Sequence, residues 1–398
     1  MIGEVPLITK PLTSFEAFSQ PRADVAAIFD QLIEDFTFAK EHLTKDGGSF
    51  KGTPTKATAA AYLAKTYLYK KDYAKCETAA REAIAMAEEA GFKLIDDFES
   101  IFDVNNEANP ELLFYFAFER NSGMWEQDFS VERGIRSGIR PLPNELKPIQ
   151  GGEGWGYALP SRDLYDAFEP GDPRRAYTMY APGDDFGVYT ESTPFNYQHI
   201  IYNNAGVLET TNVTYNRGDM VKYEWQWSPT GMNVKKLTEN LEGLTNIRYA
   251  GLDAPVMRMA DLYLFLAEAL AEQGKPEALV WVNKVRARAS VNMPPKTTAD
   301  GTLRDIVRRE RRVELAMEGH RIFDLFRWDA VKEVYGNGRK VKLHFYSDIR
   351  TTSANDGEDG RFKTVVGLSR FPTDHVLVNG TFTILLISAY TFPNVYKF

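Results

Sequence analysis

The chain has 398 residues, of which 43% are apolar and 26% are charged, a composition typical of a globular protein that excludes a disordered or fibrous one. Its net charge of −8 argues against a general nucleic-acid-binding protein, since a phosphate backbone requires an excess of Lys and Arg. The single cysteine, Cys76, excludes an internal disulfide framework and a cysteine-based metal cluster. No stretch approaches the roughly 18–20 apolar residues that span a bilayer, and residues 1–6 resemble no export signal.

The N-terminal part of the sequence predicts three helices. Asp24 can cap the first, whose apolar positions recur with a helical period. Thr53 and Pro54 suit the cap and the first position of the second helix, which continues to Leu68. A break at 70–72 separates it from a third helix, which we expect to stop at Gly91.

The second and third of these helices form a hairpin with small residues where they cross, as in a tetratricopeptide-like repeat. A second hairpin is predicted downstream, with helices at 260–270 and 276–289 joined by a turn at 273–275. Any antiparallel helix hairpin has this periodicity, but we favour the repeat interpretation. Such a unit cannot bury its apolar face alone, so each pair must stack on other helices.

The middle of the chain is rich in aromatic residues and in loops. Residues 112–118 read as a buried strand, and 151–156 form a glycine-rich loop followed by a short helix. The glycine-rich loop lacks the Lys-Ser/Thr of a phosphate-binding loop, so its glycines are expected to allow tight turns around Trp155. Residues 177–227 predict long loops and short strands, and long loops in compact proteins are usually functional.

Metal and catalytic motifs are weak. The five histidines are scattered, and residues 103–107 and 356–360 read as turns, so no metal or cofactor is predicted. Glu126 with Asp128, or Glu191 with nearby acids, could be proposed as a glycosidase pair, but nothing distinguishes them from surface charge. We therefore predict no enzymatic activity.

Residues 308–314 form the densest charge run, in a helix expected to begin near Thr302. Charges there alternate with apolar residues that continue to Trp328. This pattern predicts a partly buried ion-pair network between helices, in preference to nucleic-acid binding. Glu310 and Glu314 would repel each other, so arginines are expected between them.

Aromatic residues on loops are the remaining functional signal, because a sugar ring stacks its C–H face on Trp or Tyr while polar groups contact its hydroxyls. Trp225 and Trp227 would share one face of an extended segment. Any single aromatic is more often a core residue, but one or two on an exposed surface are plausible. The glycan-binding candidates are Trp125, Trp155, Tyr157, Trp225 and Trp227.

Three segments together resemble the SusD/RagB family. They are 253–269, with its Pro-x-x-Arg-x-Ala-Asp core, the helix at 282–289, and the most specific stretch, 309–328. Residues 3–7, the helix pair at 55–87 and the 154–161 loop also fit, so the match runs in order from about residue 3 to about residue 335.

The resemblance implies a mainly α fold with a tetratricopeptide-like scaffold and an irregular, aromatic, loop-rich middle. It divides the chain into three parts. Residues 1–110 are the remainder of an N-terminal region with a helix pair, residues 111–250 are the aromatic, loop-rich ligand-binding region, and residues 251–398 are a C-terminal region with a helix pair. Family members are outer-membrane lipoproteins of Bacteroidetes-type bacteria that bind glycans and cover a SusC-like TonB-dependent transporter. The chain is thus expected to be a non-catalytic cell-surface protein that delivers oligosaccharides to such a transporter, with no nucleic acid as partner.

Two features depart from the family pattern. Members usually have a longer N-terminal segment with a lipobox cysteine, whereas Cys76 lies inside a predicted helix. The end of the chain, 379–394, has an apolar run in place of the usual closing strand and would favour aggregation if unpaired. We expect a truncated or frame-shifted copy, and the flanking DNA would test this. Two other functions remain open: a transporter-docking scaffold without a sugar site, and, less favoured, a glycoside hydrolase.

Overall fold

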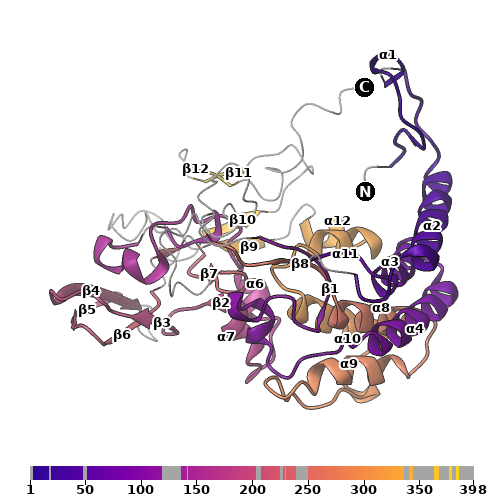
Figure 1. The fold of residues 1–398 in the computed structure, drawn as a ribbon. Coiled ribbons are helices and arrows are strands. Elements are labelled where there is room, and N and C mark those ends of the chain that lie inside the picture. Colours follow the sequence, from indigo (N-terminus) through magenta and orange to yellow (C-terminus); the bar gives the residue numbers. More distant parts are fainter. Residues whose placement is uncertain are drawn as a thin grey trace.

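The computed structural model describes residues 3–17, 19–47, 52–118, 136–140, 142–202, 208–224, 227–228, 230–238 and 250–335, with short strands at 340–343, 363–366, 376–378 and 382–384. Helices stack on one side of the molecule, and the middle of the chain extends from them to the other side, ending in a long hairpin (Figure 1). Within these residues, no helix is both long enough and apolar enough to cross a membrane.

The N-terminal helices follow the predicted order. α1 (Ser14–Ala17) precedes α2 (Val25–His42), which Asp24 caps by accepting a hydrogen bond from the amide of Ala26. α3 (Lys56–Tyr69) and α4 (Tyr73–Glu89) form the first hairpin, and α4 ends just before Gly91, whose φ is +91°.

The start of α3 corrects the predicted cap. Thr55 caps the helix, and neither Thr53 nor Pro54 is part of it. The hydroxyl of Thr55 accepts from the amide of Thr58, and the hydroxyl of Thr58 accepts from the amide of Thr55. This reciprocal pair satisfies two free amides at once, which a cap at Thr53 would not do.

The second hairpin joins α8 (Met259–Glu272) to α9 (Ala278–Arg286). α9 is shorter at both ends than the predicted 276–289. Pro276 lies in the turn before the helix, because the first amides of α9 close three-residue turns onto Lys275 and Pro276. α10 (Leu303–Glu314), α11 (Arg321–Arg327) and α12 (Val331–Tyr335) follow. α10 begins next to Thr302, as predicted, and Thr302 caps it.

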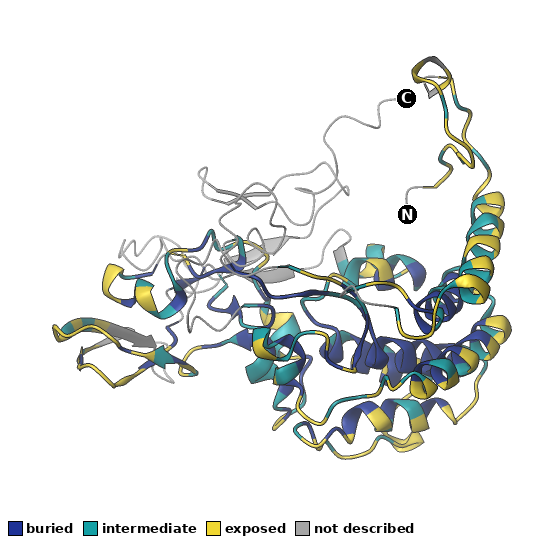
Figure 2. Cartoon of the chain, viewed as in Figure 1, coloured by how far each residue is buried: buried dark blue, intermediate teal, exposed yellow. Residues whose placement is uncertain are grey.

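α8 lies at the centre of the largest hydrophobic cluster of the described residues. All its residues from Met259 to Ala271 are buried, and Figure 2 shows it enclosed by the other helices. A helix that is buried on every side must be apolar all round, as the sequence of α8 largely is. Alanines of α3 and α4 pack in the same cluster, and α4 contacts α8 directly. The two predicted hairpins therefore stack on each other, and residues from both 1–110 and 251–398 share one core.

The strands pair in twos within the described residues. β1 (Leu112–Phe116) pairs antiparallel with β8 (Ala254–Arg258), which confirms the predicted buried strand, although Phe116 at its end is 57% exposed. The remaining pairs are β2 (Met179–Tyr180) with β7 (Asn233–Val234), β3 (Asp185–Val188) with β6 (Met220–Lys222), β4 (Phe195–Tyr202) with β5 (Leu208–Tyr215), β9 (Lys340–Leu343) with β10 (Lys363–Val366), and β11 (Val376–Val378) with β12 (Phe382–Ile384). The described short helices are η1 (Glu99–Phe102), η2 (Val104–Asn106), η3 (Asn144–Gln150), α6 (Arg162–Tyr165), α7 (Arg174–Thr178) and η6 (Thr298–Asp300).

The β4–β5 hairpin is longer than the predicted short strands, with eight residues in each strand. Phe195 faces Tyr215 and Tyr197 faces Val213 in its register, and all four pack on a second cluster around Trp227. The alternation of apolar and polar residues puts these side chains on one face, so the base of the hairpin is anchored by burial.

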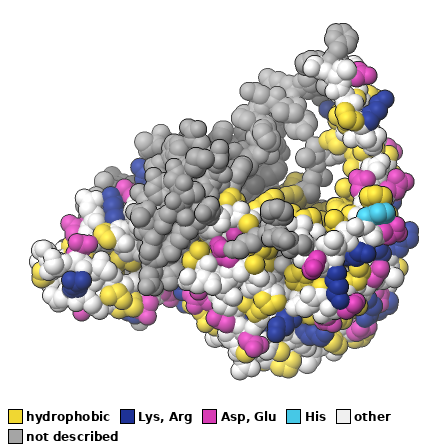
Figure 3. Space-filling model, in the orientation of Figure 1, with side chains coloured by type: hydrophobic (Ala, Val, Ile, Leu, Met, Phe, Trp, Pro, Cys, Tyr) yellow, Lys and Arg dark blue, Asp and Glu magenta, His cyan; other side chains and the backbone are white. Residues whose placement is uncertain are grey.

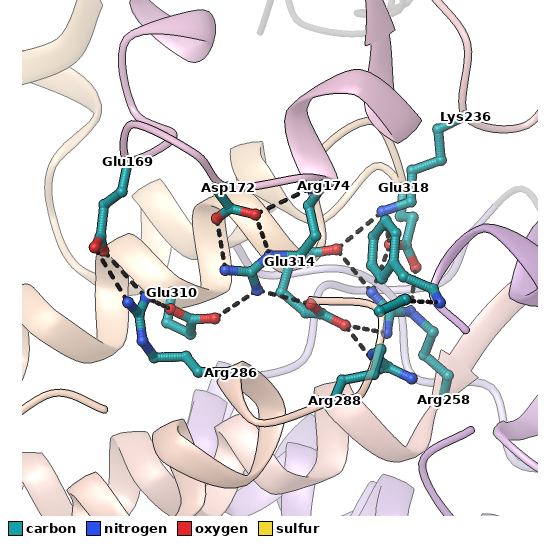
Figure 4. A network of polar contacts seen from close by, with 12 residues as sticks. Glu169, Asp172, Arg174, Lys236, Arg258, Arg286, Arg288, Glu310, Glu314 and Glu318 are labelled. Atoms are coloured by element: carbon teal, nitrogen blue, oxygen red, sulfur yellow. Dashed lines mark hydrogen bonds and ion pairs between the residues drawn. The ribbon is translucent and has the colours of Figure 1, made fainter. Parts of the chain in front are cut away.

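A buried cluster of charged groups surrounds Glu314 at the end of α10 (Figure 4). Arg174, Arg258 and Arg288 all donate to its carboxylate, and both Glu314 and Arg174 have fully buried side chains. Arg174 also donates to Glu310, so an arginine does lie between the two glutamates, but it comes from α7 and not from α10 itself.

The cluster extends well beyond these residues. Lys236 donates to the backbone oxygen of Glu314 and to Glu318, and Arg258 also binds Glu318. The remaining members are Glu111, Glu169, Asp172, Arg286 and Lys296. We call all twelve residues the buried ion cluster. Within it, acidic and basic side chains are equal in number, so its formal charges balance.

The predicted ion-pair network is therefore confirmed. A second set of buried pairs joins Arg311 to Asp261 and Asp324, and Arg327 to Glu268. Figure 3 shows the outer surface of the helices from one side. The described basic and acidic side chains are interspersed on it and form no continuous basic stripe there. From the charge run of α10, Glu310, Arg311 and Glu314 are thus buried and form ion pairs inside the fold.

We expect Glu314→Gln to lower the free energy of unfolding by about 3 kcal/mol or more, the typical cost of removing one partner from a buried ion pair. The neutral amide would leave three buried guanidinium groups without their shared counter-charge. Chemical denaturation measures the change. Glu89→Gln is the matched control, since its pair with Lys45 is solvent-exposed and should matter far less. Equal effects of the two variants would contradict the stabilising role of the cluster.

The fold should also lose stability in acid. Burial by itself would raise the pKa of Glu318, but Arg258 and Lys236 outweigh this effect and lower the pKa to about 2. A carboxyl whose pKa is lowered on folding stabilises the fold above the unfolded value of about 4.5, and that contribution is lost as the pH falls toward about 2. The thermal midpoint should therefore drop across this window, and drop less in Glu318→Gln. A flat profile there would refute the prediction.

Candidate functional site

The glycine-rich loop lies against the backbone of residues 136–139. The amide of Gly154 donates to the oxygen of Ile139 at 3.1 Å, and that of Gly156 to Gly138 at 2.9 Å. A Cβ at Gly154 would come within 2.1 Å of the carbonyl carbon of Gly138, so no other residue fits there. The glycines therefore allow the tight turn, as predicted, and they also allow the backbone of the loop to pack closely on that of residues 136–139.

This packing presents two aromatic rings. Tyr157 is 57% exposed, and Trp155 beside it is half-buried. Their ring centres are 5.9 Å apart at an angle of 61°, and the guanidinium of Arg136 lies 5.9 Å from the Trp155 ring. We call Arg136, Trp155 and Tyr157 the aromatic platform. Such a platform offers ring surface to the C–H face of a sugar, with a polar guanidinium beside the rings.

A cavity of about 270 Å³ adjoins the aromatic platform. Ser137 and Ala158, which follow Arg136 and Tyr157 in the chain, both line it. We call it the platform cavity. The other described residues that line it are Val234, Leu237, Pro255, Met317, Glu318 and Gly319.

The backbone of this cavity is strained. Ala158, Leu237 and Met317 have φ values of +55°, +69° and +66°, a region that residues with side chains rarely adopt. Gly319 has a φ of +84°, which glycine tolerates. Strained residues persist only where the surrounding structure holds them, and they gather at functional sites. Three such residues around one cavity therefore mark it as a candidate binding site.

Glu318 links the platform cavity to the buried ion cluster. Its side chain is only 2% exposed and accepts hydrogen bonds from Lys236 and Arg258. Both its neighbour Met317 and Leu237, the neighbour of Lys236, line the cavity. The cluster therefore fixes two walls of the cavity.

The structure separates the five predicted aromatic residues. Trp155 and Tyr157 lie together on the aromatic platform. Trp227 is 2% exposed, between Phe186 and Tyr223, and its ring nitrogen donates to Tyr197, so it is a core residue with no face free for a sugar. Trp125 and Trp225 lie outside the described residues.

The sequence did not predict that the residues of the platform cavity form a site. The residue types of Leu237 and Met317 do not indicate a positive φ, since it depends on the packing around each residue. Residues 103–107 form a turn as predicted, with Asp103 accepting from the amide of Asn105. Across the described part of the chain, no group of three acidic, histidine or cysteine residues is placed to hold a metal ion.

Comparison with known proteins identifies the family of this chain. The model of the SusD family matches residues 121–377. The SusD-like protein P2 of Formosa agariphila is 30% identical over 362 residues, which cover 87% of this chain and 65% of that protein. This chain thus spans just under two-thirds of that relative's length.

Solved structures agree in fold. A SusD-like carbohydrate-binding protein from Bacteroides fragilis has a TM-score of 0.62 and 26% identity, over 92% of this chain and 70% of that one. A laminarin-binding SusD-like protein has a TM-score of 0.60 and 25% identity, over 90% and 70% of the two chains. With the matched family model and the helical fold, these likenesses show that the chain belongs to the SusD family.

Proposed function

We propose that the protein is a non-catalytic glycan-binding protein whose ligand stacks on the aromatic platform. The exposed ring of Tyr157, beside Trp155 and Arg136 in a chain of the SusD family, carries this proposal. A carbohydrate-binding protein and a laminarin-binding protein among the similar structures support it.

Binding of this kind requires no reactive group. Ring stacking and hydrogen bonds to hydroxyls hold a sugar without making or breaking a bond. Of the acidic residues considered for hydrolysis, Glu191 is exposed on the surface, while Glu126 and Asp128 lie outside the described residues. A solvated carboxylate is a poor general acid at neutral pH, which supports binding over hydrolysis.

By family membership, we extend the proposal to delivery of the bound glycan to a SusC-like TonB-dependent transporter at the outer membrane. The stacked helical hairpins form the scaffold that carries the platform, and their charged outer surface suits an aqueous exterior (Figure 3). The alternative function, a docking scaffold without its own sugar site, would use the same helices but not the platform.

Tyr157→Ala and Trp155→Ala should each weaken glycan binding about tenfold or more, because a stacked ring contributes more than about 1.4 kcal/mol. Affinity electrophoresis against a panel of polysaccharides measures this as lost retardation. Phe38→Ala is the matched control, since this ring is 63% exposed on α2, well away from the platform in sequence. Retardation that survives both platform substitutions would rule out the platform as the binding surface.

The transporter assignment has its own test. A tagged copy of the protein should co-purify from membranes with a SusC-like transporter, and Tyr157→Ala should leave this association intact. Association without any glycan retardation of the unmodified protein would instead favour the docking scaffold. Release of reducing ends from a polysaccharide by the purified protein would contradict the non-catalytic proposal.

A further inference from the structure

We propose that the platform cavity takes up one sugar unit of the bound glycan and that this unit is uncharged, so the protein selects neutral over anionic glycans. The inference rests on the proposed glycan binding and adds the class of ligand. It is carried by the size of the cavity, its lining and the charges behind it.

The size of the cavity suits one sugar unit. Its volume of about 270 Å³ lies below the roughly 300 Å³ at which pockets for drug-sized ligands begin. Ala158 at its edge directly follows the exposed Tyr157. A glycan can therefore place one unit in the cavity and stack the next on the aromatic platform, whereas a longer piece of chain would not fit inside.

The lining is mainly apolar. Five of the eight described lining residues are apolar: Ala158, Val234, Leu237, Pro255 and Met317. They can cover the C–H face of a sugar ring. The backbone of Gly319 and the side chain of Ser137 are polar groups in the lining. A few placed polar groups in an apolar pocket are typical of sites for small neutral ligands.

The described lining offers no charge that could pair with an anion. Glu318 is the one charged side chain among the described lining residues, and its pKa of about 2 keeps it negative at neutral pH. Lys236 and Arg258 are already paired with it. Among the described lining residues, a uronate or sulfate group in the cavity would therefore find no basic side chain to pair with. Burying an unpaired charge in this way is strongly unfavourable.

Buried contacts support the walls of the cavity, and a well-supported cavity can discriminate between neutral and anionic sugar units. Lys236 and Glu318 form an ion pair at 2.6 Å with both side chains almost fully buried. The pair joins the two residues next to Leu237 and Met317, which have left-handed conformations and line the cavity. A rigid pocket rejects a mismatched group because it cannot rearrange to supply a new partner.

A polysaccharide panel tests the class of ligand. The purified protein is run in native gels containing laminarin, starch or mannan, which are neutral, and alginate, polygalacturonate or chondroitin sulfate, which are anionic. We expect retardation by at least one neutral polysaccharide and by no anionic one. Retardation by any anionic polysaccharide that Tyr157→Ala abolishes would overturn the selectivity but leave glycan binding standing. Retardation by none of the six would count against the proposed function itself.

A second experiment tests the cavity. Ala158→Phe fills it from an exposed position of positive φ, whereas Ala108→Phe puts the same side chain at another exposed residue of positive φ that does not line the cavity. Binding of the retarding polysaccharide should weaken tenfold or more in the first variant and stay unchanged in the second. Thermal denaturation checks that both are folded. Unchanged binding by folded Ala158→Phe, together with loss of binding in Tyr157→Ala, would show that the platform acts without the cavity. The panel needs no variant, so misfolding of Ala158→Phe would leave the ligand class testable.

Discussion

The carboxylate of Glu314 is the point on which the structure depends. Arg174, Arg258 and Arg288 reach it from α7, from the end of β8 and from the segment after α9, so the chain can bury this charge only after these distant parts have come together. An unpaired charge in the interior would be very costly. The cluster therefore makes correct assembly of the helical hairpins with the middle of the chain a condition of folding, and the closely balanced charges keep the interior neutral.

The candidate site follows from the same constraint. The aromatic platform stands on a close contact between two backbones, Gly138 and Gly154, and the platform cavity is walled by strained residues beside Lys236 and Glu318. Loops carry the proposed binding surface, and the ion pair of Lys236 with Glu318 connects one side of it to the buried ion cluster. A protein that holds a glycan without altering it requires this kind of preformed surface, since its affinity depends on little reorganisation during binding.

Much of the scaffold could be predicted because it is coded locally. Asp24 caps its helix, α10 begins next to Thr302 and Gly91 follows the end of α4, all as expected, since these effects depend on neighbours within one turn. Predictions failed where two local signals competed. Thr53-Pro54 is an attractive helix start, but Thr55 and Thr58 form a reciprocal cap. The long β4–β5 hairpin was missed because its base is fixed by packing around Trp227, far from its turn.

The sequence by itself determined the helical hairpins, the partly buried ion-pair network around 308–314 and the resemblance to the SusD/RagB family, because periodicity, caps and motifs are properties of consecutive residues. Only the tertiary structure decided that Tyr157 is exposed while Trp227 is 2% exposed, that an arginine from α7 separates Glu310 from Glu314, and that Leu237 and Met317 wall a cavity. Exposure of a ring, pairing of a charge and strain in a backbone all depend on which distant segments pack around a residue, and no local pattern records those neighbours.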